Sequence, residues 1–155
     1  MTPEDKLRTL FYMQTRDQAD RALFDELVHD EMTTIDDPAG VRVEGKEAHW
    51  AGIDIPLQNK VGPASFSYGA AFLGYWGDEQ QGVASWSFRP TGAFAALWGL
   101  KGVVIEEADA PTIEIAIKVK FKDGKISQFE EFWNPVPWLQ QIGVEIPTPT
   151  LANLS

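Results

Sequence analysis

Apolar and polar positions alternate most regularly between Thr112 and Asn134, and this alternation predicts two β-strands joined by a tight turn. Asp123-Gly124 is the expected turn, because glycine adopts positive φ angles without a steric penalty. The second strand, from about residue 126 to 134, carries two adjacent carboxylates. In the first strand every second position is apolar: Ile113, Ile115, Ile117, Val119 and Phe121.

The adjacent carboxylates, Glu130 and Glu131, must point to opposite faces of the sheet. A two-residue loop pairs Phe121 with Ile126 and turns Glu130 to the isoleucine face. A three-residue loop with Gly124 in a bulge shifts the register by one residue and turns Glu131 there instead. We favour Glu131 as the inward carboxylate, because its side of the strand is the more aromatic one.

The N-terminal part has helical spacing of its apolar positions. Thr2 is the expected N-cap of a first helix, with proline and acidic residues in its first turn. A second helix is expected to end near His29-Asp30, where the histidine would lie at the C-terminus. A third is expected from Gly45 to about Leu57.

The remaining strands are predicted by β-branched and alternating segments. These are a short strand over Met32–Asp36 and two long strands over Ser65–Gly77 and Gln81–Pro90. Thr91–Pro111 is the least regular segment, and its apolar run Ala93–Trp98 is interpreted as a flap over a cavity, part of a subunit interface or a continuation of the sheet.

This order of elements predicts an α+β fold: a cone-shaped, curved antiparallel sheet with three N-terminal helices over its concave face. Residues 1–145 are expected to form a single domain, since the chain of 155 residues is too short for two ordinary ones. A short helical turn is expected over Trp138–Gly143, and residues 146–155, rich in proline and threonine, are expected to form an extended tail.

Composition narrows the choice of partners. The net charge of −10 argues against binding to nucleic acid or to anionic membrane surfaces. There is no cysteine, and no apolar run approaches membrane-spanning length, so a cytoplasmic protein without a thiolate metal site is expected. Six tryptophans and nine phenylalanines either fill a core or line an apolar cavity.

Three segments together resemble the SnoaL-like polyketide cyclases of the nuclear transport factor 2-like superfamily. The resemblance spans roughly residues 5–143 and implies the cone-shaped fold, a small-molecule cavity and a homodimer formed through the outer face of the sheet. The mixed-charge outer face of the final hairpin agrees with such a dimer. The segments are Leu23-Phe24 to Asp36-Asp37-Pro38, Val43-Glu44-Gly45-Lys46-Glu47-Ala48, and Val119-Lys120-Phe121-Lys122-Asp123-Gly124-Lys125-Ile126.

The C-terminal part is similar to the end of the phenazine biosynthesis A/B proteins, in which a strand glutamate lies in the cavity as an acid/base. The similar segments are Glu131-Phe132-Trp133-Asn134, Leu139-Gln140-Gln141-Ile142-Gly143 and Ile146-Pro147-Thr148-Pro149. The resemblance implies this acid/base role for Glu131. It also implies a histidine on the third helix, for which His49 is the candidate.

Three residues are therefore candidates for catalysis: Glu131, His49 and Asp36. Burial in an aromatic cavity raises the pKa of a carboxyl group, so that it can give and take protons near neutral pH. Asp36 is either a catalytic group at the cone mouth or a turn residue of Asp36–Gly40. His49 is either a second acid/base or a histidine on the helix surface.

Candidate substrate-binding residues are mostly aromatic, with one arginine that is expected either to bind a substrate carboxylate or to pair with Glu114. No metal cluster, phosphate loop or nucleophile motif is recognisable, and no cofactor is expected. The candidates are Tyr12, Trp50, Tyr68, Trp76, Trp86, Arg89 and Trp133.

The expected function is that of a cofactor-independent cyclase or isomerase, which acts on a small, apolar, natural-product-like ligand with Glu131 as acid/base. An alternative is a non-catalytic protein that binds a small ligand or has an accessory role in the same fold. A third possibility is a dehydratase or an epoxide-hydrolase-like enzyme that uses Asp36 with His49.

Overall fold

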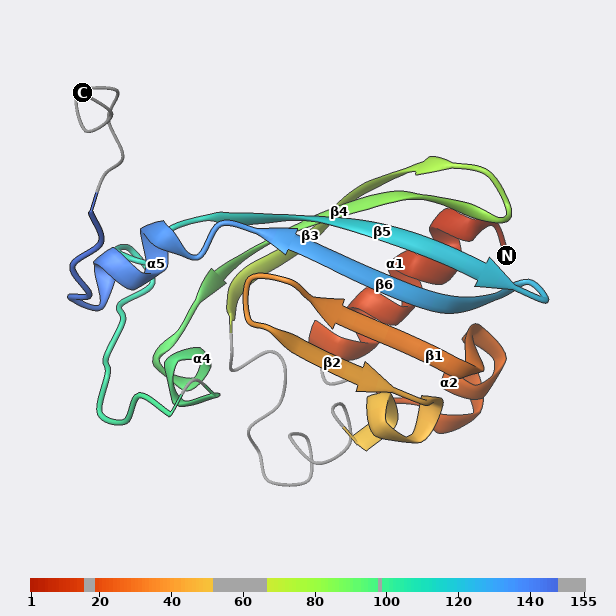
Figure 1. Cartoon of the computed structure of the whole chain (residues 1–155), viewed down its shortest axis with the longest axis horizontal. Coiled ribbons are helices and arrows are strands. Elements are labelled where there is room, and N and C mark those ends of the chain that lie inside the picture. The colour runs from red at the N-terminus through yellow and green to blue at the C-terminus, as the bar shows by residue number, and fades with distance from the viewer. Residues whose placement is uncertain (16–18, 52–66, 98, 148–155) are drawn as a thin grey trace.

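A computed structural model describes residues 1–15, 19–51, 67–97 and 99–147. Six strands form one curved sheet with the order β2-β1-β6-β5-β4-β3 (Figure 1). The long strands predicted from alternation are all present in it. The strands are β1 (Val28–Asp36), β2 (Val41–Glu44), β3 (Ser67–Gly77), β4 (Gln81–Pro90), β5 (Ile113–Lys122) and β6 (Lys125–Trp133).

The sheet is mixed, which corrects the expectation of an antiparallel one. β1 runs parallel to β6, whereas every other neighbouring pair is antiparallel. The antiparallel pairs are joined by hairpins or lie close in the chain, but β1 and β6 come from opposite ends of the sequence. No short turn therefore fixes their relative direction.

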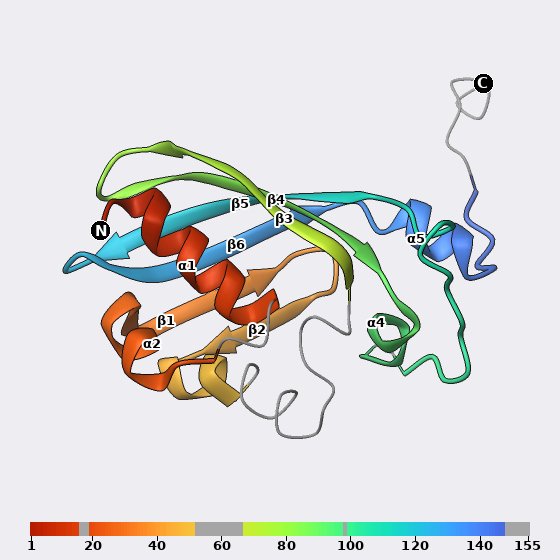
Figure 2. The same cartoon turned by 180° about the vertical axis from the view of Figure 1, so that it is seen from behind.

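The helices are α1 (Pro3–Thr15), α2 (Arg21–Leu27), α4 (Gly92–Leu97) and α5 (Val136–Gln141), and residues 46–51 are helical as well. Thr2 caps α1 as expected, because the backbone N–H of Asp5 donates to its Oγ1 at 3.1 Å. Figure 2 shows α1 lying across one face of the sheet. In the described parts of the chain, no helix is long and apolar enough to span a membrane.

Two boundaries in the N-terminal part differ from those expected. α2 ends at Leu27, and the backbone N–H of Val28 caps it, so His29 lies in β1 and not at a helix C-terminus. The strand β2 was not expected, because its four residues are too few to show a period. Positions 52–57 of the expected third helix and positions 148–155 of the expected tail lie outside the described residues.

The core consists of two clusters that meet along β4 and β6. The larger cluster joins α1 and α2 to the inner face of the sheet, and the smaller one surrounds Trp138 of α5. Phe88 and Trp133 pack against both clusters. The helix α4 lies in the segment that showed no regular pattern, and it joins the smaller cluster through the buried Ala95.

Candidate functional site

The parallel pairing of β1 with β6 places Asp36 directly opposite Glu131. Two residues earlier, Thr34 pairs with Phe129 in the same register. The backbone N–H of Asp37 donates to the Glu131 carbonyl at 3.4 Å and extends the contact between the strands. Because paired residues of a parallel ladder share a face, both carboxyl groups lie on the inner side of the sheet.

The turn between β5 and β6 has two residues, Asp123 and Gly124, with φ angles of 52° and 73°. Positive φ at both positions is typical of a type I′ turn, which matches the twist of a hairpin. Beyond it, Lys122 pairs with Lys125 and Phe121 with Ile126. Continued without a break, this register would direct Glu130 inward.

A bulge in β6 reverses that outcome. Lys120 pairs with Gln128, so Ser127 is the additional residue on β6, and its hydroxyl donates to the Lys120 carbonyl at 3.1 Å. Beyond the bulge Ile117 pairs with Glu131. The shift that turns Glu131 to the isoleucine face therefore comes from Ser127 and not from a longer turn.

Glu131 and Asp36 line a cavity of about 430 Å³, a volume that suits a small organic molecule. Most of its wall is apolar, and the wall is built from β1, β2, β4, β5, β6, α4 and the turn after β1. The lining residues are Asp36, Ala39, Val41, Phe88, Phe94, Ile115, Glu131 and Trp133.

The carboxyl group of Glu131 is the most perturbed titratable group of this cavity. Burial, and to a smaller extent the negative charge of Asp36, together raise its pKa from an ordinary value of 4.5 to about 8. Within the described chain, the Glu131 side chain forms no hydrogen bond that would stabilise its ionised form. At neutral pH Glu131 is therefore mostly protonated and able to donate.

Asp36, in the wall of the same cavity, has a different environment. Its Oδ1 accepts a hydrogen bond from the indole Nε1–H of Trp133 at 2.9 Å and one from the backbone N–H of Ala39 at 3.1 Å. Both donors hold the carboxylate in one orientation. Asp36 therefore shapes the turn after β1, as one interpretation expected, and it also lines the cavity; its catalytic role, the other interpretation, stays a prediction.

His49 lies on the helical residues 46–51, outside the set of residues that line the cavity. Its Nδ1 is 2.9 Å from the Gly45 carbonyl and must donate to it, so Nε2 accepts from the Thr34 hydroxyl at 2.6 Å. Burial lowers the pKa of His49, which keeps the ring neutral. Thr34 lies two positions before Asp36 on the same side of β1, so the histidine is next to the site but not in its wall.

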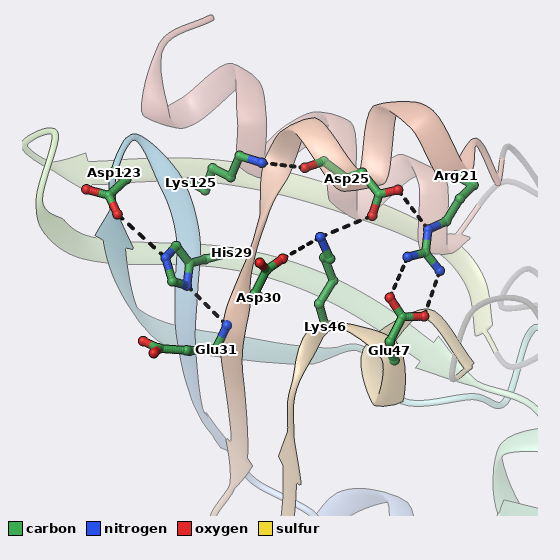
Figure 3. A network of polar contacts seen from close by, with 9 residues as sticks. All are labelled: Arg21, Asp25, His29, Asp30, Glu31, Lys46, Glu47, Asp123 and Lys125. Atoms are coloured by element: carbon green, nitrogen blue, oxygen red, sulfur yellow. Dashed lines mark hydrogen bonds and ion pairs between the residues drawn. The ribbon is translucent and has the colours of Figure 1, made fainter.

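An ion-pair network fixes the short helix that carries this histidine (Figure 3). Lys46 bridges Asp30 at 2.5 Å and Asp25 at 3.3 Å. Arg21 of α2 binds both carboxylate oxygens of Glu47, at 2.5 and 2.9 Å. Two-point contacts of this kind restrict orientation as well as position.

Of the aromatic residues expected to bind substrate, Trp133 is in the cavity wall and three others are packed elsewhere. Trp86 is buried in the larger cluster, with its ring 5.2 Å from that of Phe11. Tyr12 packs against the same cluster, and Trp50 lies against Phe24 at 5.2 Å. None of these three is among the residues that line the cavity.

Tyr68 and Arg89 both form hydrogen bonds with the segment that follows α4. The Tyr68 hydroxyl donates to the Ile105 carbonyl at 2.9 Å. The Arg89 guanidinium donates to the carbonyls of Ala110 and Glu107 and forms an ion pair with the Glu107 carboxylate at 3.8 Å. Its acidic partner is therefore Glu107 and not Glu114, and neither Tyr68 nor Arg89 lines the cavity.

Trp76 is on the outer face of the sheet, with 63% of its surface exposed. It was expected to bind substrate, but it is not among the residues that line the cavity, and a register shift between Phe72 and Gly74 turns it outward. Tyr75 takes the inward position instead and packs against Phe121. Bulges of this kind leave no clear trace in the alternation of apolar residues.

The sequence did not single out several residues of the wall, above all Val41, Phe88 and Phe94. Phe88 shares a strand face with Trp86, a signal that was visible in the alternation. Phe94 belongs to the apolar run Ala93–Trp98, for which a flap over a cavity was one of three interpretations.

Among the described residues, no group of three or more histidine and acidic side chains could hold a metal ion.

No family model matches the sequence, and no curated protein matches it. Solved structures with similar folds include the following three. IdmH of Streptomyces antibioticus, a proposed polyketide cyclase, has a TM-score of 0.61 at 14% identity over 90% of this chain and 97% of its own. A proposed SnoaL-like polyketide cyclase from Jannaschia has a TM-score of 0.58 at 14% identity, over 95% and 98% of the two chains.

The third is a protein with a ketosteroid isomerase-like fold from Catenulispora acidiphila, solved in complex with trimethylamine. It has a TM-score of 0.59 at 13% identity, over 94% of this chain and 96% of its own. Identities this low establish likeness of fold alone. The chain has the fold of the SnoaL-like cyclases and ketosteroid isomerase-like proteins, and the similarity of its C-terminal part to the phenazine proteins stays a prediction.

Proposed function

We propose that this protein is a cofactor-independent cyclase or isomerase that acts on a small, largely apolar, natural-product-like molecule, with Glu131 as its acid/base. The observation that carries the proposal is the position of the Glu131 carboxyl in an aromatic cavity beside Asp36. A pKa of about 8 lets this group exchange protons with a substrate near neutral pH.

In a cyclisation, protonated Glu131 donates its proton to a carbonyl oxygen of the substrate. A carbon of the same molecule attacks the carbonyl carbon, and the new hydroxyl keeps the donated proton. The Glu131 carboxylate then takes the proton that the attacking carbon loses, so the enzyme returns to its starting state. An isomerisation uses the same two transfers at two positions of one molecule.

Asp36 acts through Glu131 in this account. Its fixed negative charge disfavours a second charge nearby and so keeps Glu131 protonated. The Trp133 indole holds the Asp36 carboxylate in place at 2.9 Å. Asp36 is thus a positioning residue, and its removal should alter the pH dependence of the reaction rather than only its rate.

Exchange of the α-protons of 2-tetralone in D₂O, followed by NMR, tests this proposal without knowledge of the substrate. Each exchange needs the two transfers described above. The rate should fall above a pH of about 8, as Glu131 loses its proton. Glu131→Gln should reduce catalysed exchange by about 10²–10⁴-fold, and Asp36→Asn should move the alkaline fall to lower pH.

Glu130→Gln is the matched control, because Glu130 is adjacent in the chain but lies on the outer face, where it pairs with Lys118 at 3.3 Å. It should exchange 2-tetralone as fast as the unchanged protein. Equal rates for Glu131→Gln and Glu130→Gln would contradict the assignment of Glu131.

A second candidate function is non-catalytic binding of a small ligand in the same cavity. The mostly apolar wall supports it, since such a wall binds ligands whether or not a proton moves. A Glu131 carboxyl with an ordinary pKa and no catalysed exchange would favour this function over the enzyme.

A dehydratase or an epoxide-hydrolase-like enzyme that uses Asp36 with His49 is the third candidate. Its support is the hydrogen bond from Thr34 to His49 beside Asp36 on β1.

We also propose that two copies pair through the outer face of the sheet. There Gly74, Ser85, Ala116 and Phe132 form a row across four strands.

A further inference from the structure

The titratable groups of the cavity are all acidic. Asp36 and Glu131 are the two titratable residues of its wall, and none of the described lining residues is basic. Arg89, the candidate for binding a substrate carboxylate, is instead engaged by Glu107 and two backbone carbonyls. An anionic occupant would therefore face repulsion from Asp36 without a compensating cation.

The apolar wall next to these carboxyl groups includes three aromatic rings. The centroid of Phe88 is 5.3 Å from that of Phe94 and 6.3 Å from that of Trp133, and Phe94 and Trp133 are 6.2 Å apart. The rings are tilted or edge-to-face rather than stacked, and all three residues line the cavity. Rings from different elements that converge on one cavity are suited to hold a cation over their π surfaces.

One carboxylate oxygen of Asp36 remains able to interact with a bound ligand. Its Oδ1 accepts both hydrogen bonds, from Trp133 and Ala39, whereas Oδ2 accepts none from the residues that the structure describes. The negative charge thus lies at the wall of an aromatic cavity, held in orientation but not neutralised by a nearby basic group of that wall. A buried or half-buried charge in this situation gains from a counter-ion.

We propose that the cavity binds an organic cation, with a small alkylated ammonium group of the substrate set against Phe88, Phe94 and Trp133 and facing Asp36. This inference rests on the proposed function, because it names the substrate class for the same cavity. It extends the expectation of an apolar ligand: the body of the molecule is apolar, but its nitrogen carries a positive charge.

A cation in this position also changes the chemistry of Glu131. The described residues that line the cavity with Glu131 come from β1, β2, β4, β5, β6, α4 and the turn after β1, and Asp36 is the one charged group among them. A bound ammonium offsets that charge and lowers the pKa of Glu131 from about 8 towards neutrality. Below pH 8, binding should therefore release protons, and affinity should rise with pH.

Choline and 3,3-dimethylbutan-1-ol are the probes for this proposal, because they have nearly the same shape and differ in charge. Titration calorimetry of the full chain with each probe gives the affinities. Choline should bind at least about tenfold more tightly than the neutral alcohol. Repeating the choline titration in buffers with different ionisation enthalpies measures the proton release.

Asp36→Asn should abolish the preference for choline and leave the affinity for the alcohol within about twofold. Asp37→Asn is the matched control, since it removes one negative charge from an adjacent exposed position outside the cavity wall. It should keep the full preference. Glu131→Gln should bind choline with an affinity that does not change with pH around 8.

Equal or tighter binding of the neutral alcohol would overturn the proposal, and so would the absence of choline binding at about 10 mM. These failures are distinct from a failure of the proposed function. If choline does not bind but Glu131 still catalyses exchange of 2-tetralone, the acid/base role stands and the cationic substrate is wrong. If Glu131 has an ordinary pKa, the acid/base role itself is wrong.

Discussion

At the scale of single residues, Asp36 and Glu131 illustrate how two carboxyl groups opposite each other acquire different roles. The Asp36 carboxylate accepts two hydrogen bonds, whereas the Glu131 carboxyl accepts none from the described residues, and burial and the charge of Asp36 raise the pKa of Glu131. Such separation of two carboxyl groups by environment is a recurrent basis of acid/base chemistry. It depends on the Trp133 indole, which reaches Asp36 from the neighbouring strand.

The raised pKa of Glu131 predicts a particular change of stability with pH. Between pH values of about 4.5 and 8 the unfolded chain has lost this proton while the folded chain retains it, so the free energy of unfolding falls as the pH rises. Glu131→Gln removes this contribution. Urea denaturation should show that the variant gains stability relative to the unchanged protein between pH 5 and pH 8 by a few kcal/mol.

Glu130→Gln is again the control, because Glu130 lies on the outer face of β6, and it should not gain stability with rising pH as Glu131→Gln does. Parallel stability curves for Glu131→Gln and the unchanged protein would indicate that Glu131 titrates alike in the folded and unfolded chain.

At the scale of elements, the hairpin of β5 and β6 shows what alternation can and cannot predict. The two strands and the turn Asp123-Gly124 follow directly from the pattern of apolar residues and from glycine. The bulge at Ser127 has no such signature, yet it decides which glutamate lies in the cavity. The inward position of Tyr75 in β3 was missed for the same reason.

The turn of this hairpin should be sensitive to its glycine. Gly124 has a φ angle of 73°, and an added Cβ would meet only the Lys6 ammonium, at 3.8 Å. Gly124→Ala therefore tests backbone strain without a steric clash, and denaturation should show a loss of about 1 kcal/mol. Asp123→Asn is the matched control and should be nearly neutral, because asparagine also tolerates positive φ.

At the scale of the whole molecule, the element order predicted the α+β class, but not the way the two ends of the chain meet. The site exists because β1, from the N-terminal part, pairs in parallel with β6, from the C-terminal part. No local pattern encodes a pairing between segments so far apart. The Phe94 side of the cavity also depends on α4, which lies in the segment without a regular pattern.

The proposed dimer belongs to this scale as well. Ala116 is exposed in the middle of β5, next to Ser85 and Phe132 on the outer face. Ala116→Arg would place a long charged side chain in this row, so we expect the variant to sediment as a monomer and the unchanged protein as a dimer. Ala22→Arg, on the exposed side of α2, should stay dimeric. A monomeric unchanged protein would rule out this interface.

The most direct test of the account is an NMR titration of the Glu131 side-chain carboxyl in protein labelled with ¹³C at glutamate, assigned with Glu131→Gln. We predict a pKa of about 8 for this group and a lower value in Asp36→Asn. A pKa close to 4.5 in the unchanged protein would contradict the account, because Glu131 would then be ionised at neutral pH and unable to donate its proton.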